Sequence, residues 1–197
     1  WLGPIILLFS LIGSTYTILY MLMRKILHTT LLEYLFVSTI FVLATIQFTW
    51  SYYDAFFWYN GAMYYTLFYS LSLLLGSLLI CYQQTSSLIK KWGIGAFSIC
   101  LAIIIAGGNF VSGLGIGAIL FTSIILMRLV QKKWSYFNIA ILVIYGISFA
   151  TSVLAPGNAY RQITVEDQPN IIVAFFMAIG KSFEFLADSF NIVQILV

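Results

Sequence analysis

Charged residues are scarce in this chain of 197 residues, and their scarcity excludes an ordinary soluble fold. Only 8% of the residues are Asp, Glu, Lys or Arg, whereas 62% are hydrophobic and the mean hydropathy is +1.02. A soluble domain carries roughly 25% charged residues. We therefore expect the lipid bilayer to be the solvent. The net charge of +3 indicates no nucleic-acid partner, because the basic residues stand in short groups beside apolar runs.

Cysteine and histidine are also rare, which removes the usual signals of metal and redox chemistry. Cys81 and Cys100 lie inside apolar runs, form no CxxC pair, and are expected to be inert buried thiols. The single histidine, His28, makes no site on its own. No P-loop, nucleophile elbow or HExxH motif is present, so the sequence carries no signature of a soluble enzyme.

Long apolar runs predict an all-α, polytopic transmembrane helix bundle. A spanning helix needs about 20 apolar residues to cross roughly 30 Å of hydrocarbon. We expect one transmembrane domain over residues 1–197, as part of a longer protein, because no initiator Met or signal peptide is seen. Six spanning helices and a C-terminal helix are predicted at about 4–23, 31–49, 60–82, 94–106, 114–128, 134–154 and 171–197.

Two of these segments leave alternatives open. Segment 94–106 would span only about 20 Å at 1.5 Å per residue. Either Gly107 and Gly108 extend this helix, or the following turn lies below the membrane surface and opens a cavity. In the last segment, Lys181, Glu184 and Asp188 share one helical face. That helix either lies on the membrane, which we favour for 171–189, or spans it with the charged face toward the bundle.

Basic residues occupy every second connection, which predicts the orientation of the chain. By the positive-inside rule, the connections at 24–30, 83–92 and 128–134 are cytoplasmic. The connections at 50–60, 107–114 and 155–170 are then external. Of the nine Lys and Arg residues, only Arg161 and Lys181 fall outside the cytoplasmic set. Trp50, Trp58, Trp92 and Trp134 fall at predicted helix ends, as expected for an interfacial aromatic belt.

The first external connection is rich in aromatic residues and contains a single acid, Asp54. Rings such as Trp58 and Tyr59 can stack on the apolar faces of a sugar, while Asn60 bonds its hydroxyl groups. Asp54 is the candidate general base for a glycosyl acceptor. The alternative is an aromatic belt with an acid in a turn. Asn60 and Gly61 are also candidates to cap the third helix.

The other two external connections carry Gly-Asn motifs. In the stretch Gly107-Gly108-Asn109, glycine lets the backbone approach a ligand or another helix closely, and Asn109 is a candidate sugar ligand. Tight helix packing is the alternative. In the stretch APGNAYR, Asn158 is a candidate sugar ligand and Arg161 a candidate phosphate ligand. Arg161 could equally anchor a lipid phosphate or pair with Glu166 or Asp167.

The three external motifs, taken in order, resemble a known family. YDAFFWYNGAMYYT, AGGNFVSGL and SVLAPGNAYRQ are similar to motifs of bacterial polytopic membrane proteins of unassigned function, often labelled glucosyltransferase-like. The resemblance covers about residues 50–165. This family is similar to the GT-C superfamily of integral-membrane glycosyltransferases, which use polyprenyl-phosphate sugars at the external face. In GT-C enzymes the catalytic acid commonly lies in the first external loop, which this chain would lack.

The resemblance implies an enzyme of the bacterial envelope. Its plasma-membrane site would take a polyprenyl-phosphate-linked sugar, with a cell-wall polymer as a candidate acceptor. Whether Asp54, Glu166 or Asp167 holds Mg²⁺ or Mn²⁺ stays open, because such a site needs several convergent oxygens. The alternative function is a non-catalytic transporter or flippase-like module for lipid-linked glycans or another polar solute. The lack of ionisable residues in the middle of the first six helices speaks against ion-coupled transport.

Overall fold

The computed structural model describes residues 2–49 and 53–157, together with Val173, Phe176, Met177, Gly180, Lys181 and Glu184. Of Asp54 and Tyr59 it describes the backbone alone. The described residues form helices and no strand, so the predicted all-α bundle is confirmed. In chain order the elements are α1 (Leu2–Leu19), η1 (Tyr20–Ile26), α2 (Leu31–Gln47), η2 (Tyr53–Phe57), α3 (Tyr59–Ala62), η3 (Met63–Leu67), α4 (Phe68–Gln84), α5 (Leu88–Gly108), α6 (Phe110–Gln131) and α7 (Tyr136–Val153), the η segments being π-helical.

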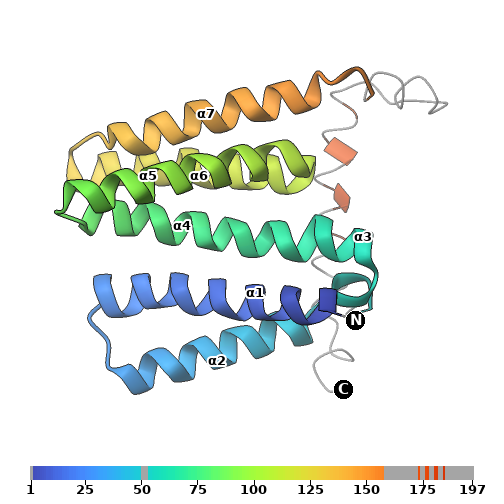
Figure 1. Cartoon of the computed structure of the whole chain (residues 1–197), viewed down its shortest axis with the longest axis horizontal. Coiled ribbons are helices and arrows are strands. Elements are labelled where there is room, and N and C mark those ends of the chain that lie inside the picture. Colours follow the sequence, from blue (N-terminus) through green and yellow to red (C-terminus); the bar gives the residue numbers. More distant parts are fainter. Residues whose placement is uncertain are drawn as a thin grey trace.

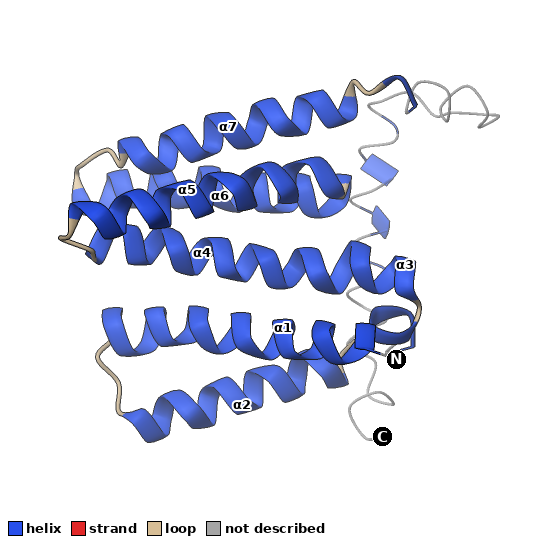
Figure 2. Cartoon of the chain, viewed as in Figure 1, coloured by secondary structure: helices blue, strands red, loops and turns tan. Residues whose placement is uncertain are grey.

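The long helices run up and down beside one another (Figure 1). Helix α5 packs against α4, α6 and α7, while α1 joins α4 to the outlying α2. The described connections are short and alternate between two opposite ends of the bundle (Figure 2). We call the end with the connections after η1, α4 and α6 the basic end. The opposite end, with η2, α3 and the turn between α5 and α6, is the motif end.

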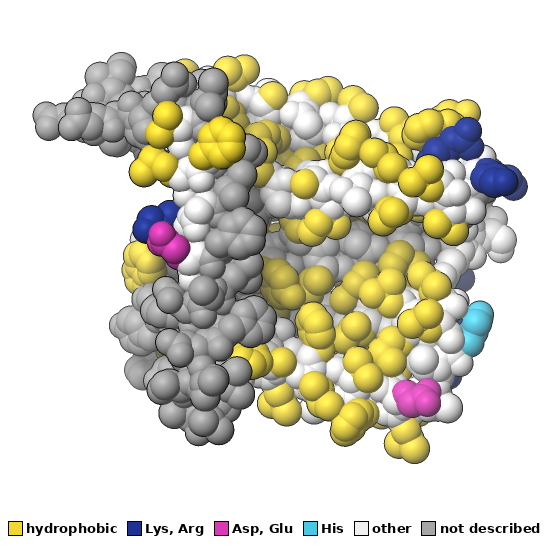
Figure 3. All heavy atoms as spheres, turned by 180° about the vertical axis from the view of Figure 1, so that it is seen from behind, with side chains coloured by type: hydrophobic (Ala, Val, Ile, Leu, Met, Phe, Trp, Pro, Cys, Tyr) yellow, Lys and Arg dark blue, Asp and Glu magenta, His cyan; other side chains and the backbone are white. Residues whose placement is uncertain are grey.

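Five helical segments are long and apolar enough to cross a membrane, which makes this a multi-pass membrane protein. They are Leu2–Ile26, Asn60–Gln84, Leu88–Gly108, Ser112–Val130 and Tyr136–Val153. Helix α2, with 17 residues, lies at the short limit for a span. Apolar side chains cover much of the described side surface (Figure 3). The described Lys and Arg side chains gather at the basic end, apart from Lys181.

Helix α5 corrects the predicted bounds most strongly. It runs from Leu88 to Gly108, not over 94–106, and its 21 residues suffice to cross a membrane. Lys90 and Lys91 lie in its first turn because a helix can continue into the headgroup region when its lysines reach water. Gly107 and Gly108 are part of the helix, which is the first of the two predicted alternatives. A cavity inferred from a short helix here therefore has no basis.

The core lies among α4, α5, α6 and α7, and small residues bring these helices together. Ala102, Ile105, Leu75 and Ile141 are fully buried in it. The buried serine hydroxyls of α4 and α5 bond within their own helix, as Ser98 does to the Ile94 carbonyl at 2.8 Å. Such hydroxyls need no hydrogen-bond partner from another helix. Their small side chains let helix backbones approach closely, as is typical of membrane helices.

Two turns at the basic end are built alike. His28 and Lys132 adopt left-handed backbone conformations, with φ of 56° and 54°. In the first turn an Nη1 atom of Arg24 donates to the Thr29 carbonyl, and in the second Arg128 donates in the same way to the Lys132 carbonyl. These arginines thus close the turns that follow their helices, in addition to marking topology.

The two cysteines are free but not both buried. Cys81 is partly buried, and Cys100 is exposed on the side of α5. The prediction of two buried thiols is therefore wrong for Cys100. An apolar run in a membrane protein has a lipid-facing side, so its residues need no protein partner to leave water.

Two of the three residues of the predicted charged stripe near the C-terminus are described. Lys181 and Glu184 are helical, and their side chains form an ion pair at 2.5 Å. Both side chains are exposed. Asp188 lies outside the described residues, so the choice between an interfacial and a spanning helix stays a prediction.

Candidate functional site

The predicted site residues divide into a described and an undescribed group. Trp58 and Asn60 are exposed at the motif end, in the helical stretch that leads into α4. Asp54 lies in η2, and Tyr59 is the first residue of α3. Asn158 and Arg161 lie outside the described residues. The expectation that Asn60, Asn109, Asn158 and Arg161 meet in one recess therefore stays a prediction.

The connection at 50–60, predicted as a loop, is partly helical. Residues 53–57 form η2, and α3 begins at Tyr59, with the Ala62 amide donating to the Trp58 carbonyl at 2.8 Å. The cap position is thus Trp58, and Asn60 lies inside the first turn, which corrects the predicted capping role of Asn60. Thr66 Oγ1 donates to the Ala55 carbonyl at 2.6 Å and fixes η2 against η3.

Asn109 has a structural role at the turn between α5 and α6. Its Nδ2 donates to the Tyr64 carbonyl at 3.1 Å, and its Oδ1 accepts from the Ser112 amide at 3.3 Å. The second bond satisfies one of the free amides at the start of α6. Asn109 thus caps α6 and ties it to η3 at Tyr64, which lies four residues beyond Asn60 in the chain. The amide predicted to bind sugar is engaged in holding two helical segments together.

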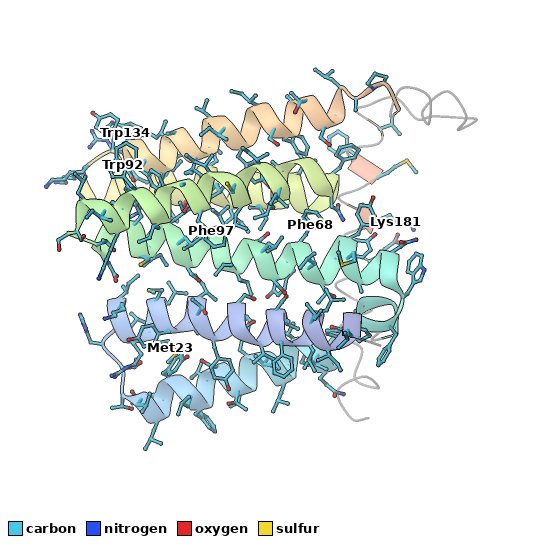
Figure 4. The ribbon with its side chains drawn as sticks, in the orientation of Figure 1. Met23, Phe68, Trp92, Phe97, Trp134 and Lys181 are labelled. Carbon is cyan, nitrogen blue, oxygen red and sulfur yellow. The ribbon has the colours of Figure 1, made fainter. Side chains whose placement is uncertain are left out.

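The glycines beside Asn109 are contact points between helices. A Cβ atom at Gly108 would meet the Phe68 ring of α4 at 1.9 Å, and one at Gly113 would meet the Phe149 ring of α7 at 2.8 Å. Figure 4 shows Phe68 between α4 and α5. The carbonyl of Gly107 accepts from Ser152 Oγ at 3.0 Å. This geometry supports tight helix packing, the alternative to ligand approach.

A recess of about 240 Å³ lies at the motif end between α1, α2, η2 and the η3–α4 stretch. Its floor is Leu11 of α1, which is 2% exposed. Its surface is mainly apolar, and the small polar part comes from hydroxyl residues, namely Thr45, Thr49, Tyr65, Thr66 and Tyr69. Thr45 Oγ1 donates to the Phe41 carbonyl and Thr49 Oγ1 donates to the Thr45 carbonyl. Thr45 is also hydrogen-bonded to the Tyr69 side chain. The described lining carries no charged side chain.

These hydroxyl residues were missed by sequence reasoning, although one signal was present. Thr45 and Thr49 stand four residues apart, as do Tyr65 and Tyr69, so each pair shares one helical face. Asp54 directly precedes Ala55, which lines the recess. The recess therefore opens beside the segment that carries the predicted general base.

Among the described residues, no group of three or more His, Cys, Asp or Glu side chains stands close enough to hold a metal ion. Glu166 and Asp167, the other two predicted oxygen ligands, lie outside them. A divalent-cation site formed by Asp54, Glu166 and Asp167 thus stays a prediction from the sequence.

Three comparisons with known proteins give no match. No family model matches the chain. No curated protein and no solved structure is significantly similar to it. These comparisons therefore add no support to the family resemblance, which rests on the three sequence motifs alone.

Proposed function

We propose that this multi-pass membrane protein binds a polyprenyl-phosphate-linked sugar at its motif end and transfers the sugar to an acceptor. The motif end would face the outside of the bacterial plasma membrane, opposite the basic end. The observation that carries the proposal is the uncharged recess beside η2, which is mainly apolar and carries a few hydroxyl groups. Its apolar surface, which includes the rings of Tyr65 and Tyr69, suits the apolar face of a neutral sugar, and its few hydroxyl groups suit the hydroxyls at the sugar's edge.

The size of the recess supports one sugar ring as its occupant. Pockets that enclose drug-sized ligands are roughly 300–1,000 Å³, and this one is about 240 Å³. The phosphate and the polyprenyl chain would then lie outside it, with Arg161 as the proposed phosphate ligand. Trp58, Tyr59, Asn60 and Asn158 are proposed contacts to the sugar or acceptor at its rim. Asn109 positions the wall, since it bonds to the residue before Tyr65.

The proposed reaction is a direct displacement at the anomeric carbon. Asp54, or an acid outside this chain, accepts the proton of the acceptor hydroxyl. The acceptor oxygen bonds to the anomeric carbon as the bond from that carbon to the phosphate oxygen breaks. The polyprenyl phosphate leaves with the electron pair.

A non-catalytic carrier or flippase-like module for lipid-linked glycans is the second candidate. The specific observation in its favour is that the described lining of the recess contains no acid or base, so it accounts for binding without chemistry. The carrier needs no general base at Asp54, which separates the two candidates.

The test uses the full-length protein in proteoliposomes with a radiolabelled polyprenyl-phosphate sugar. Thr45→Val with Thr49→Val should weaken binding by about 10-fold, since each lost hydrogen bond is worth about 0.5–1.5 kcal/mol. The matched control is Thr17→Val, which loses the same type of intrahelical hydroxyl bond on α1 outside the recess. Asp54→Asn should abolish transfer and retain binding. Label that crosses the bilayer without transfer, in wild type and variant alike, supports the carrier.

A further inference from the structure

Two adjoining hollows mark the basic end. The larger, about 370 Å³, is mainly apolar and is lined by Leu88, Trp92, Gly95, Ala96, Ile99 and Phe137. The smaller, about 200 Å³, is more polar and is lined by Gln83, Met127, Lys133, Trp134 and Ser135. Tyr82 and Lys91 line both hollows, so the two form one groove with an apolar part and a polar part. We call it the basic-end groove.

Aromatic stacking and a small residue shape the apolar part. The Tyr82 ring of α4 stacks on the Phe137 ring of α7, with centroids 3.6 Å apart and planes at 13°. Gly95 of α5 lies against both rings, since a Cβ atom there would be 3.5 Å from Phe137 and 3.7 Å from Tyr82. The rings thus form a fixed wall. Larger side chains at positions 95 and 96 would occupy this part of the groove, so Gly95 and Ala96 keep it open.

The polar part is cationic. Lys91 Nζ lies 5.6 Å from the centroid of the Tyr82 ring, and Lys133 comes from the next connection at this end. The groove's lining includes no carboxylate. Among the described acids, Glu33 is the one at the basic end, and its carboxylate accepts a hydrogen bond from the Thr30 amide at the start of its own helix. The charge of the groove therefore favours an anion.

The groove lies at the depth of lipid headgroups. Trp92 is 74% exposed and Trp134 is 50% exposed at the same end of the bundle (Figure 4). Such tryptophans mark the membrane–water interface. From Leu88 to Ile99 the apolar part follows α5 for about 16 Å, given 1.5 Å per residue. Its occupant must accordingly combine an anionic head with a long apolar chain, which a free phosphate ion lacks.

We propose that the basic-end groove binds one anionic phospholipid from the leaflet at this end. The phosphate lies between Lys91 and Lys133, and one acyl chain follows Trp92, Ala96 and Ile99. The site is separate from the sugar recess, which lies at the other end of the bundle. The two proposals therefore stand or fall independently.

The test measures phosphatidylglycerol and phosphatidylcholine bound to the purified full-length protein by native mass spectrometry. Wild type should retain one phosphatidylglycerol in preference to phosphatidylcholine. Lys91→Gln with Lys133→Gln should lower phosphatidylglycerol affinity by roughly fivefold per lysine, from the usual strength of one basic residue at an anionic membrane. Ala96→Phe, on the exposed side of α5, should lower it without a change of charge.

The matched control is Lys90→Gln with Lys132→Gln. It removes the same two charges from the same two connections, and neither residue lines the groove. The control should bind phosphatidylglycerol within twofold of wild type. An equal loss in both double variants overturns the proposal, because it shows a diffuse charge effect. Displacement of the lipid by millimolar inorganic phosphate, or by polyprenyl phosphate in preference to phosphatidylglycerol, also overturns it.

Discussion

The Asn109 side chain reaches across the motif end and donates a hydrogen bond to the Tyr64 carbonyl at 3.1 Å. Tyr64 is followed by Tyr65, which lines the mainly apolar recess at this end. The corner between α5 and α6 thus supports one wall of the proposed sugar site from behind. Asn109, which the sequence predicts as a sugar ligand, instead holds the backbone next to Tyr65 in place.

Loss of the Asn109 hydrogen bonds should lower the free energy of unfolding by a measurable amount. Asn109→Ala removes the cap of α6 and the bond to Tyr64, and should cost about 1–3 kcal/mol. Asn109→Ser retains a capping oxygen but has no amide, so it should cost about half as much. The control Asn60→Ala, at an exposed position, should stay within about 0.5 kcal/mol of wild type. Unfolding by SDS in mixed micelles measures all three, and equal values for Asn109→Ala and Asn60→Ala would contradict the structural role.

The contact of Gly108 with Phe68 predicts a large difference between the effects of alanine at Gly108 and at Gly115. Gly108→Ala forces the Phe68 ring to move, because ring carbons lie 1.9 and 2.0 Å from the added Cβ, and should cost about 1–3 kcal/mol. Gly115 has nothing within 4 Å of an added Cβ. Gly115→Ala should therefore be neutral or stabilising by about 0.5–1 kcal/mol.

A second-site change separates contact from other causes. Phe68→Leu should be less costly in the Gly108→Ala background than in wild type, which unfolding titrations of the four proteins measure as a coupling energy. Additive costs would show that the ring and the glycine do not contact each other.

The left-handed turn at His28 predicts a stabilising substitution. A residue other than glycine pays roughly 1–2 kcal/mol in this conformation, and His28 has φ of 56°. His28→Gly should raise the free energy of unfolding by about 0.5–1 kcal/mol once the greater backbone entropy of glycine is offset. His28→Ala is the matched control and should bring no gain. A gain from alanine equal to that from glycine would point to loss of the imidazole as the cause.

The capping box at the start of α2 predicts a pH effect. The Thr30 amide, donating to Glu33 Oε2 at 2.7 Å, and then the Thr30 hydroxyl lower the pKa of Glu33 below its ordinary 4.5. Because the folded pKa is the lower one, this contribution to stability is complete above 4.5 and is lost as the pH falls through the folded pKa. Thr30→Val should raise the pKa only part of the way, since the amide remains. An NMR titration of the Glu33 carboxyl checks this, with Thr30→Ser as the control that should match wild type.

The up-and-down helix order could be predicted from apolar runs, because each span must bury its own backbone and needs a nearly fixed length. The start of α5 could not be predicted in this way, because the charges of Lys90 and Lys91 and the adjacent Trp92 are typical of a connection between spans. In a membrane protein those side chains reach the interface from within a helix. The sequence therefore places the start of α5 six residues, or nearly two turns, too late.

The candidate site was predictable only where residues are adjacent in sequence. The aromatic stretch with Asp54 and Trp58 stands out, and the structure places both at the motif end. Thr45 and Leu11 belong to other helices and meet there only through the packing of α1 on α2 and α4. For Asn109, the motif itself does not tell whether the amide faces a ligand or a backbone carbonyl.

We propose that the two ends of the bundle face opposite sides of the membrane, with the motif end outside. It is tested by labelling with a membrane-impermeant maleimide in intact cells, after Cys81 and Cys100 are replaced by serine. Single cysteines are then placed at Ser86 on the basic end and at Gly157 on the motif end, both exposed positions. With this orientation, Gly157→Cys should be labelled in intact cells, and Ser86→Cys should be labelled only after the membrane is opened. Labelling of Ser86→Cys in intact cells, with Gly157→Cys protected, would contradict it.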